Sequence, residues 1–286
     1  MSERAYGSTV AKRRLAAILT QLRVDNGWTA NQVCDQLSWG RGKVGRFEAN
    51  QWKRPEMSDV RDLLRLYGVD DERARELEEL ATLARVRAWW RDYGDVFGAG
   101  NEFPGYEMDA SRISIYMPLI LPGLLQTQAY TDALMSIGTH SPAWRTRAGE
   151  ARQRRQQILD RDDGTAPLLR AAVTEASLMY KWGTPDERRE QIMRLVDLGQ
   201  RPNIDLRLLR FADGLHPGGL TTVNIFDFPG EQDPSLAFLE SEYALIEVGR
   251  PDEVAAYNGI FERTCAAALN PMATTEYLKH LAESQQ

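Results

Sequence analysis

The sequence predicts an α+β protein: an all-α N-terminal domain followed by an α+β domain with a small, mostly antiparallel sheet. Two observations lead to this fold class. In residues 1–70, apolar residues recur three and four positions apart, which is the spacing of amphipathic helices. Beyond about residue 165, segments that partly alternate apolar and polar residues are bounded by Pro and Gly, as strands are. We therefore expect a helical domain at 1–70, a connecting helix and loop at 71–105, and an α+β domain at 106–286.

Charge is divided unevenly along the chain. The 286 residues carry a net charge of −6, but residues 1–69 hold 12 Lys and Arg against 7 Asp and Glu, so they carry +5 and the remainder carries −11. A basic segment ahead of an acidic body is typical of a nucleic-acid-binding domain tethered to a domain that does not bind. No stretch reaches the roughly 18 apolar residues of a membrane span, and Met1–Val10 lacks the apolar core of a secretory signal. Cys34 and Cys265 lie among apolar neighbours like reduced, buried thiols, so we expect a cytoplasmic protein.

Four helices are predicted in the first domain. Thr29 is a suitable N-cap for the second helix, and Ser38-Trp39-Gly40 is a tight break before the third. A short helix, a tight turn and another short helix make a helix-turn-helix at Thr29–Ala49. The predicted helices are Lys12–Val24, Ala30–Leu37, Arg41–Ala49 and Met57–Tyr67.

The third of these helices carries side chains suited to a DNA major groove. Arg41, Lys43 and Arg46 are long donors for bases or phosphates, and Gly42 and Gly45 leave room for close approach to the duplex. A glycine inside a helix costs about 1 kcal/mol relative to alanine, which indicates that this surface has to fit against something. The alternative, that the basic side chains only solvate a surface helix, is the less favoured interpretation.

The segment TANQV…LSWGRGKVGRFE at Thr29–Glu48, followed by WKRP and an apolar helix ending in YGV, resembles the Xre (phage-repressor-like) helix-turn-helix family. The resemblance implies a regulator that binds double-stranded DNA with the third helix in the major groove. It also implies that Glu48 braces the domain rather than touching bases, and that Lys53 and Arg54 contact backbone phosphates.

One position departs from that family. The second helix usually starts with Gln, which fixes the docked helix against DNA, but this chain has Ala30 there. Asn31 or Gln32 are the candidates to make this contact instead. The complete set of expected DNA-binding residues is Asn31, Gln32, Arg41, Gly42, Lys43, Arg46, Lys53 and Arg54.

The rest of the chain is predicted to begin with one helix, Asp71–Arg91, and a Gly-rich connection at 95–105. The predicted strands are Pro167–Thr174, Asn203–Phe211, Leu220–Phe228 and Leu236–Val248. The helices expected around them are Gln126–Ile137, Gly149–Asp160, Asp186–Gly199, Asp252–Leu269 and Pro271–Glu283. This alternation favours a sheet covered by helices.

Four further segments occur in an order that resembles actinobacterial Xre-type regulators whose second domain has no assigned activity. These are Trp89-Trp90-Arg91, Ser111-Arg112-Ile113 with Tyr116, Leu121–Tyr130, and Leu215-His-Pro-Gly. With the helix-turn-helix, the resemblance extends from about Lys12 to Leu281. It implies antitoxin-like pairing with a small partner protein encoded nearby.

Motifs for catalysis or metal binding are missing from the sequence. His140, His216 and His280 have no second ligand at metal spacing, and neither a nucleophile elbow nor a phosphate-binding loop occurs. We expect no cofactor, no metal and no enzymatic activity. His216 is interpreted as a turn residue next to Pro217, with a proton-sensitive or ligand-contacting loop as the alternative.

Two hypotheses for the second domain remain open. It either binds the small partner protein, which its acidic charge favours, or encloses a small apolar effector near Trp89, Trp90, Tyr116 and Trp182. A single helix-turn-helix contacts one half-site, so we expect a homodimer on a near-palindromic operator. An enzyme with a DNA-targeting domain is the weakest alternative.

Overall fold

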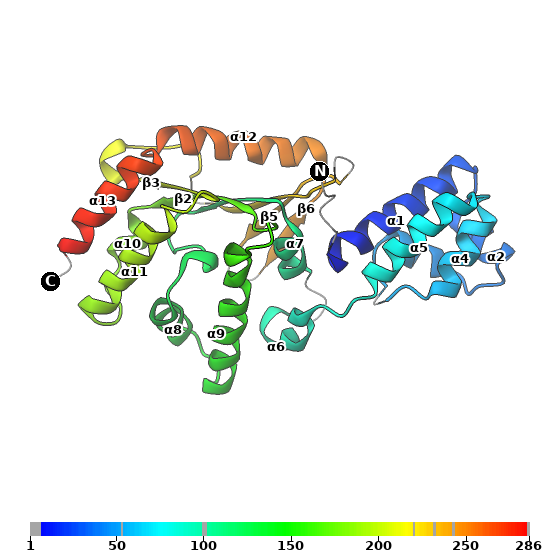
Figure 1. Ribbon diagram of the computed structural model, residues 1–286, viewed down its shortest axis with the longest axis horizontal. Coiled ribbons are helices and arrows are strands. Elements are labelled where there is room, and N and C mark those ends of the chain that lie inside the picture. The colour runs from blue at the N-terminus through cyan, green and yellow to red at the C-terminus, as the bar shows by residue number, and fades with distance from the viewer. Residues whose placement is uncertain are drawn as a thin grey trace. The chain divides into compact units, whose positions relative to one another are not determined.

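The computed structural model describes residues 7–52, 54–98, 102–219, 221–230, 233–241 and 244–284. They form two compact units (Figure 1). Unit 1 is made of Met1–Asp92 and Glu102–Asp109, and unit 2 of Tyr93–Asn101 and Ala110–Gln286.

Helices are the only regular secondary structure in the described residues of unit 1. Its helices are α1 (Ser8–Asp25), α2 (Ala30–Gln36), α3 (Lys43–Glu48), α4 (Met57–Leu66), α5 (Asp71–Ala84) and α7 (Phe103–Asp109), and the short 3-10 helix η1 (Trp89–Tyr93) follows α5. One apolar core joins α1 to α5 and includes Leu15, Val33, Val44, Leu63 and Leu77, each at most 1% exposed. Helix α5, assigned to a connection by the sequence, therefore contributes to the same core as the helix-turn-helix.

The segment after α5 differs from the sequence prediction. The single helix expected at Asp71–Arg91 stops at Ala84, and the expected connection at 95–105 contains α6 (Gly94–Phe97) and the start of α7. Helix α7 packs closely on α1 through Gly105, where a Cβ atom would lie 2.0 Å from Thr9 Oγ1. Only glycine allows this approach.

Unit 2 contains a six-stranded sheet in the order β3-β2-β1-β4-β5-β6. The strands are β1 (Arg112–Met117), β2 (Leu168–Thr174), β3 (Ile204–Leu209), β4 (Thr222–Asp227), β5 (Leu236–Glu240) and β6 (Leu245–Val248). β1 pairs in parallel with β2, and β2 with β3. The pairs β1–β4, β4–β5 and β5–β6 are antiparallel.

The prediction of a mostly antiparallel sheet is therefore wrong, since the sheet is mixed. Helices lie between β1 and β2 and between β2 and β3, and such crossovers return the chain to the starting edge, so these strands run in parallel. The sequence analysis also missed the central strand β1, although Ile113 and Ile115 alternate there with Arg112, Ser114 and Tyr116.

Helices cover both faces of the sheet (Figure 1). The long helix α12 (Pro251–Ala267) packs against β1, β4 and β5 on one face. The opposite face carries α8 (Gln128–Ser136), α9 (Pro142–Gln156), α10 (Ala176–Met179) and α11 (Pro185–Leu198), joined by the 3-10 helices η2 (Gly123–Leu125) and η3 (Gln157–Asp160). The 3-10 helix η4 (Phe211–Asp213) follows β3, and α13 (Pro271–Glu283) packs on α11 and β3.

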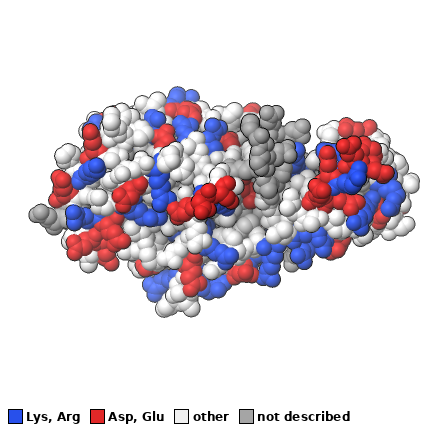
Figure 2. Space-filling view, in the orientation of Figure 1, with Lys and Arg blue, Asp and Glu red and all other residues white. Residues whose placement is uncertain are grey.

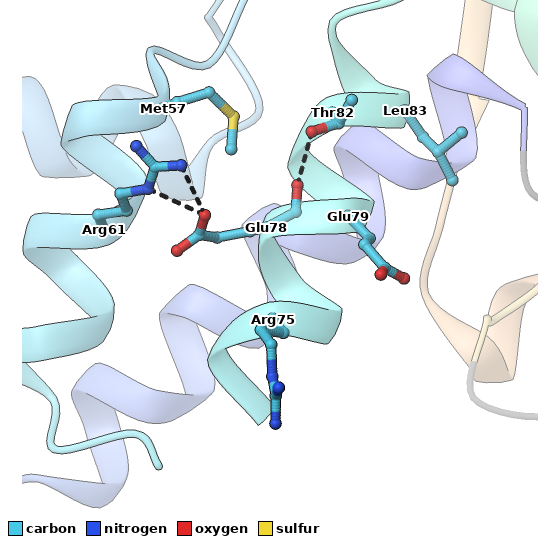
Figure 3. Close-up of a pocket in the computed structure, with 7 residues that line it drawn as sticks. All are labelled: Met57, Arg61, Arg75, Glu78, Glu79, Thr82 and Leu83. Atoms are coloured by element: carbon cyan, nitrogen blue, oxygen red, sulfur yellow. Dashed lines mark hydrogen bonds and ion pairs between the residues drawn. The ribbon is translucent and has the colours of Figure 1, made fainter. Parts of the chain in front are cut away.

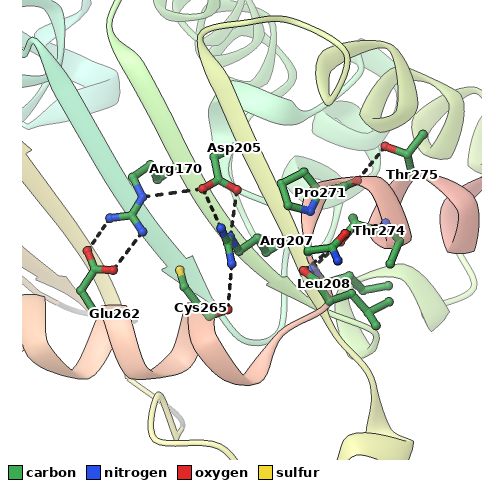
Figure 4. A network of polar contacts seen from close by, with 12 residues as sticks. Arg170, Asp205, Arg207, Leu208, Glu262, Cys265, Pro271, Thr274 and Thr275 are labelled. Carbon is green, nitrogen blue, oxygen red and sulfur yellow. Dashed lines mark hydrogen bonds and ion pairs between the residues drawn. The ribbon is translucent and has the colours of Figure 1, made fainter.

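A polar network joins α12 to the parallel half of the sheet (Figure 4). Arg170 on β2 pairs with Glu262 of α12 and lies 3.8 Å from Asp205 on β3. Arg207 pairs with Asp205 at 2.9 Å and donates a hydrogen bond to the Cys265 carbonyl. The network thus holds the C-terminal part of α12, which carries Glu262 and Cys265, against β2 and β3.

Helix α13 closes the outer edge of β3. The Leu208 N–H donates to Thr274 Oγ1 at 3.1 Å, and the Leu208 carbonyl accepts from the Leu269 N–H at 2.9 Å. Thr274 is 1% exposed, so water does not replace this bond. The backbone groups of an edge strand are satisfied here by a side chain and a loop.

Thr274→Val is expected to lower the free energy of unfolding by about 1–3 kcal/mol, because the shape is kept while the buried Leu208 N–H loses its acceptor. Urea unfolding followed by circular dichroism measures this. Thr274→Ser keeps the hydroxyl and is the matched control, so a serine variant as unstable as the valine variant would contradict the hydrogen-bond explanation.

Candidate nucleic-acid interface

The N-terminus of α2 is fixed by a capping box. The Thr29 hydroxyl accepts from the Gln32 backbone N–H at 3.2 Å, and Gln32 Oε1 accepts from the Thr29 N–H at 2.9 Å. Gln32 therefore holds the helix end with its side-chain oxygen, a role that the sequence analysis did not assign to it. Asn31, the other expected replacement for the usual Gln, is exposed on the first turn of α2.

The turn between α2 and α3 is longer than predicted. It covers residues 37–42, and α3 begins at Lys43 rather than Arg41. Gly42 is the N-cap with φ of +81°, in the left-handed region that favours glycine. The expectation that Gly42 lies in the helix is therefore wrong, because its conformation is needed to turn the chain into α3.

The three expected basic side chains of this region have different environments. Arg41 and Arg46 are exposed, and no ion pair of either is found with the described part of the chain. Lys43 Nζ lies 2.6 Å from Asp59 Oδ1 of α4 and 4.0 Å from the centre of the Trp39 ring. Lys43 thus links the turn, α3 and α4, while Arg41 and Arg46 extend into solvent.

A second ion pair joins α3 to α1. Arg23 Nη2 donates to Glu48 Oε2 at 3.0 Å, and Arg23 Nε donates to the other carboxylate oxygen. Both side chains are 15% exposed. The hydrogen bonds to Glu48 raise the pKa of Arg23. Glu48 therefore connects two helices of unit 1, which agrees with the bracing role that the resemblance implied.

Aromatic rings support the same region, and the sequence analysis did not predict their contacts with one another. Trp39 stacks on Phe47 with 6.1 Å between ring centres, and Phe47 contacts Trp52 at 4.2 Å. Asn50, at φ of +56°, follows α3 in the left-handed conformation and accepts from Trp52 Nε1 at 3.2 Å. The spacing of these aromatic residues around α3 was the available signal.

Of the two basic residues expected to contact phosphates after α3, only Arg54 belongs to the described part of the chain. Arg54 Nε and Nη2 donate to the Arg85 carbonyl at 3.1 and 3.0 Å, so part of this guanidinium is used inside unit 1. Lys53 lies outside the described residues.

Arg54 also lines a cavity of about 510 Å³ with Lys12, Arg87, Glu102 and other residues. Burial lowers the pKa of Lys12, which lies 3.5 Å from Glu102.

Another hollow lies between α4 and α5 (Figure 3). It has a volume of about 570 Å³ and is lined by Met57, Arg61 and Leu83, among others. Of the two arginines that line it, Arg61 has Nη2 2.8 Å from Glu78 Oε2, and Arg75 donates to the Asp71 carbonyl at 3.2 Å. The hollow is also lined by Glu78 and Glu79, and on the face drawn in Figure 2 acidic and basic side chains are interspersed.

The four aromatic residues expected near an effector are divided between the two units. Trp89 and Trp90 belong to unit 1, and Tyr116 and Trp182 to unit 2. Trp182 packs edge-on against Tyr130, with 5.0 Å between ring centres, whereas Tyr116 contacts His216.

The described residues contain no group of three His, Cys, Asp or Glu side chains that could hold a metal ion. None of the described helices is both long and apolar enough to cross a bilayer.

Gly42 and Gly45 provide a matched pair of substitutions with opposite expected effects on stability. Gly42→Ala should lower the free energy of unfolding by about 1 kcal/mol because alanine is strained at positive φ. Gly45→Ala should raise it by about 0.5–1 kcal/mol, because this residue is helical and a Cβ atom there meets nothing within 4 Å. Thermal unfolding of both variants tests this, and effects of the same sign would contradict the assigned backbone roles.

Comparison with known proteins assigns both parts of the chain. A helix-turn-helix domain model matches residues 14–77, which include α2 and α3. A model described as a domain of unknown function (DUF5753) matches residues 101–280. No curated protein and no solved structure matches the chain. The helix-turn-helix domain supports a DNA-binding regulator, and the chain belongs to the DUF5753 family.

Proposed function

We propose that the protein is a sequence-specific transcription regulator that binds double-stranded DNA through Arg41 and the outer face of α3. The observation that carries this proposal is the exposure of Arg41, in the turn before α3, and of Arg46 on α3, a helix that is held from two sides. Arg23 and Glu48 fix α3 to α1, and Lys43 ties it to α4. A short, fixed helix with one exposed guanidinium group on it and another in the turn before it fits a major groove about 12 Å wide.

The residues around α3 divide into two roles under this proposal. Arg41 and Arg46 approach base edges or phosphates, with Gly42 and Gly45 keeping the surface between them low. Asn31, Lys53 and Arg54 are assigned contacts with the phosphate backbone of the DNA. Gln32 fixes the position of α2. Positioning contacts of this kind set the register of the protein on DNA, and base contacts read the sequence. No catalytic role is proposed for the chain.

Arg41→Ala is expected to weaken binding by about 1–3 kcal/mol, or roughly 5- to 150-fold, to a duplex selected by the wild-type protein from a random pool. Arg46→Ala should behave similarly. Arg65→Ala on α4 removes the same charge from unit 1 and is the control. Fluorescence anisotropy at several salt concentrations measures the effect.

The same titrations distinguish the contacts and the stoichiometry. Loss of discrimination at one base pair identifies a base contact, whereas uniform weakening with a shallower salt dependence identifies a phosphate contact. We also propose that two copies bind a near-palindromic operator, so two chains per duplex are expected. Equal affinities of the Arg41, Arg46 and Arg65 variants would reject this DNA surface.

We further propose that unit 2 binds a small partner protein encoded nearby, in an antitoxin-like pairing. Exposed apolar side chains follow the carboxyl ends of β2 and β3: Met179 and Tyr180 are 54% and 52% exposed, and Phe211 is 67% exposed. Glu175 fixes this edge by accepting from the Phe211 N–H at 2.7 Å and from the Tyr277 hydroxyl. Exposed aromatic and Met side chains are enriched in protein interfaces.

Phe211→Ser is expected to weaken retention of the neighbouring gene's small product at least tenfold, because an apolar anchor is removed. The measurement is co-purification from cells that express both proteins, with washes at high salt. Ile137→Ser, at a position that is 82% exposed after α8, is the control for loss of an exposed apolar residue. Retention that is equally strong in both variants would exclude this edge as the partner surface.

A further inference from the structure

Unit 2 contains a cavity at the point where its sheet changes from parallel to antiparallel. The cavity has a volume of about 260 Å³ and lies beside the last part of β1 and the start of β4, where Tyr116 pairs with Val223. β2 flanks β1 on one side and β4 flanks it on the other. In open α/β sheets, ligands commonly bind outside the carboxyl ends of strands where the strand order reverses, as it does here between β1 and β4.

The cavity has a buried floor and an exposed rim. Tyr116, Val223, Phe261 and Thr264 are buried at its base. The rim includes Gly219 and other exposed residues of the loop that joins η4 to β4, and α12 supplies the opposite wall with two half-buried residues. The rim and wall residues are Pro217, Gly219, Thr221, Tyr257 and Ile260.

The loop wall lies directly on the Tyr116 ring. A Cβ atom on Gly218 would be 2.7 Å from two ring carbons of Tyr116, so only glycine lets the backbone lie there. The Tyr116 hydroxyl donates to the Gly219 carbonyl at 2.7 Å and fixes the loop from below. Next to it, the His216 ring meets Tyr116 edge-on, and its buried Nδ1 has no hydrogen-bond partner among the described residues.

The lining limits the charge of a ligand. No Asp, Glu, Lys or Arg is among the described residues that line the cavity. An ion would lose its hydration there without gaining a counter-charge, which is strongly unfavourable. The aromatic and aliphatic walls instead favour an apolar, flat molecule. The volume is slightly below that of sites for drug-sized ligands, so the molecule is small.

The buried hydroxyl groups specify the polar part of the ligand. The Thr264 hydroxyl donates a hydrogen bond to the Ile260 carbonyl at 2.9 Å, and the Tyr116 hydroxyl donates one to the Gly219 carbonyl. Burial raises the pKa of Tyr116 to about 12, so this phenol stays protonated at neutral pH. Both oxygens therefore offer only lone pairs to a ligand, and the ligand has to bring the donor.

We propose that this cavity binds a small, uncharged, largely apolar molecule that carries a hydrogen-bond donor directed at Thr264 or Tyr116. The proposal goes beyond DNA and partner binding and depends on neither. It assigns unit 2 a ligand site of its own, at the Tyr116 end of β1.

Indole and indene test the proposal in the full-length protein. The two probes have nearly the same flat shape, but only indole has an N–H donor. Titration followed by ¹H–¹⁵N correlation spectra should shift the amide signals of Gly218, Gly219 and Thr264 with indole. Indene should bind about three- to tenfold more weakly, as expected for one lost hydrogen bond.

Two variants locate the site. Ile260→Trp fills the cavity from a half-buried position and should weaken indole binding at least tenfold, whereas Ile246→Trp on the exposed surface of β6 is the control. Thr264→Val keeps the shape of the buried floor and should reduce the preference for indole over indene. Absence of indole binding at millimolar concentrations, equal affinity for both probes, or unchanged binding to the Ile260→Trp variant would each overturn the proposal.

Discussion

The ion pair between Arg23 and Glu48 is the contact on which the proposed DNA surface depends. Helix α3 has only six residues, far fewer than the roughly 12–15 at which an isolated helix becomes marginally stable. Its direction is therefore set by tertiary contacts. The Arg23 guanidinium binds both carboxylate oxygens of Glu48 and also donates to the Trp28 carbonyl, so one side chain connects α1, the turn before α2, and α3. Hydrogen bonds to charged groups of this kind contribute about 1.5–3 kcal/mol each.

Lys43 shows how stability and DNA binding share residues at this surface. Its ammonium group lies between Asp59 and the Trp39 ring, which holds the turn against α4. The side chain is still 30% exposed, so a phosphate could approach it only in competition with Asp59. A lysine that is already in an ion pair contributes less binding free energy to a DNA complex than an unpaired lysine, because the existing ion pair must first be broken. Arg41 and Arg46 carry no such cost.

Local signals explain what could be predicted in unit 1. The role of Thr29 as a cap follows from chemistry within a few positions of the chain, and the structure has this cap. The start of α3 was misplaced because Arg41 continues the basic pattern of a helix, while the conformation of Gly42 ends it. The pairs Arg23–Glu48 and Lys43–Asp59 join residues 25 and 16 positions apart, and no local pattern specifies such contacts.

In unit 2, a single missed strand accounts for much of what the sequence analysis did not find. Without β1, the remaining strands could not show where the parallel and antiparallel halves of the sheet meet. The cavity exists because of that meeting. β1 has helical crossovers on its β2 side, while the chain reaches β4 through the loop that covers Tyr116. A side chain at the end of β1 is therefore overlaid by a loop and by α12 together, which a sheet built only from hairpins would not provide. The proposed ligand site is thus a consequence of the mixed topology.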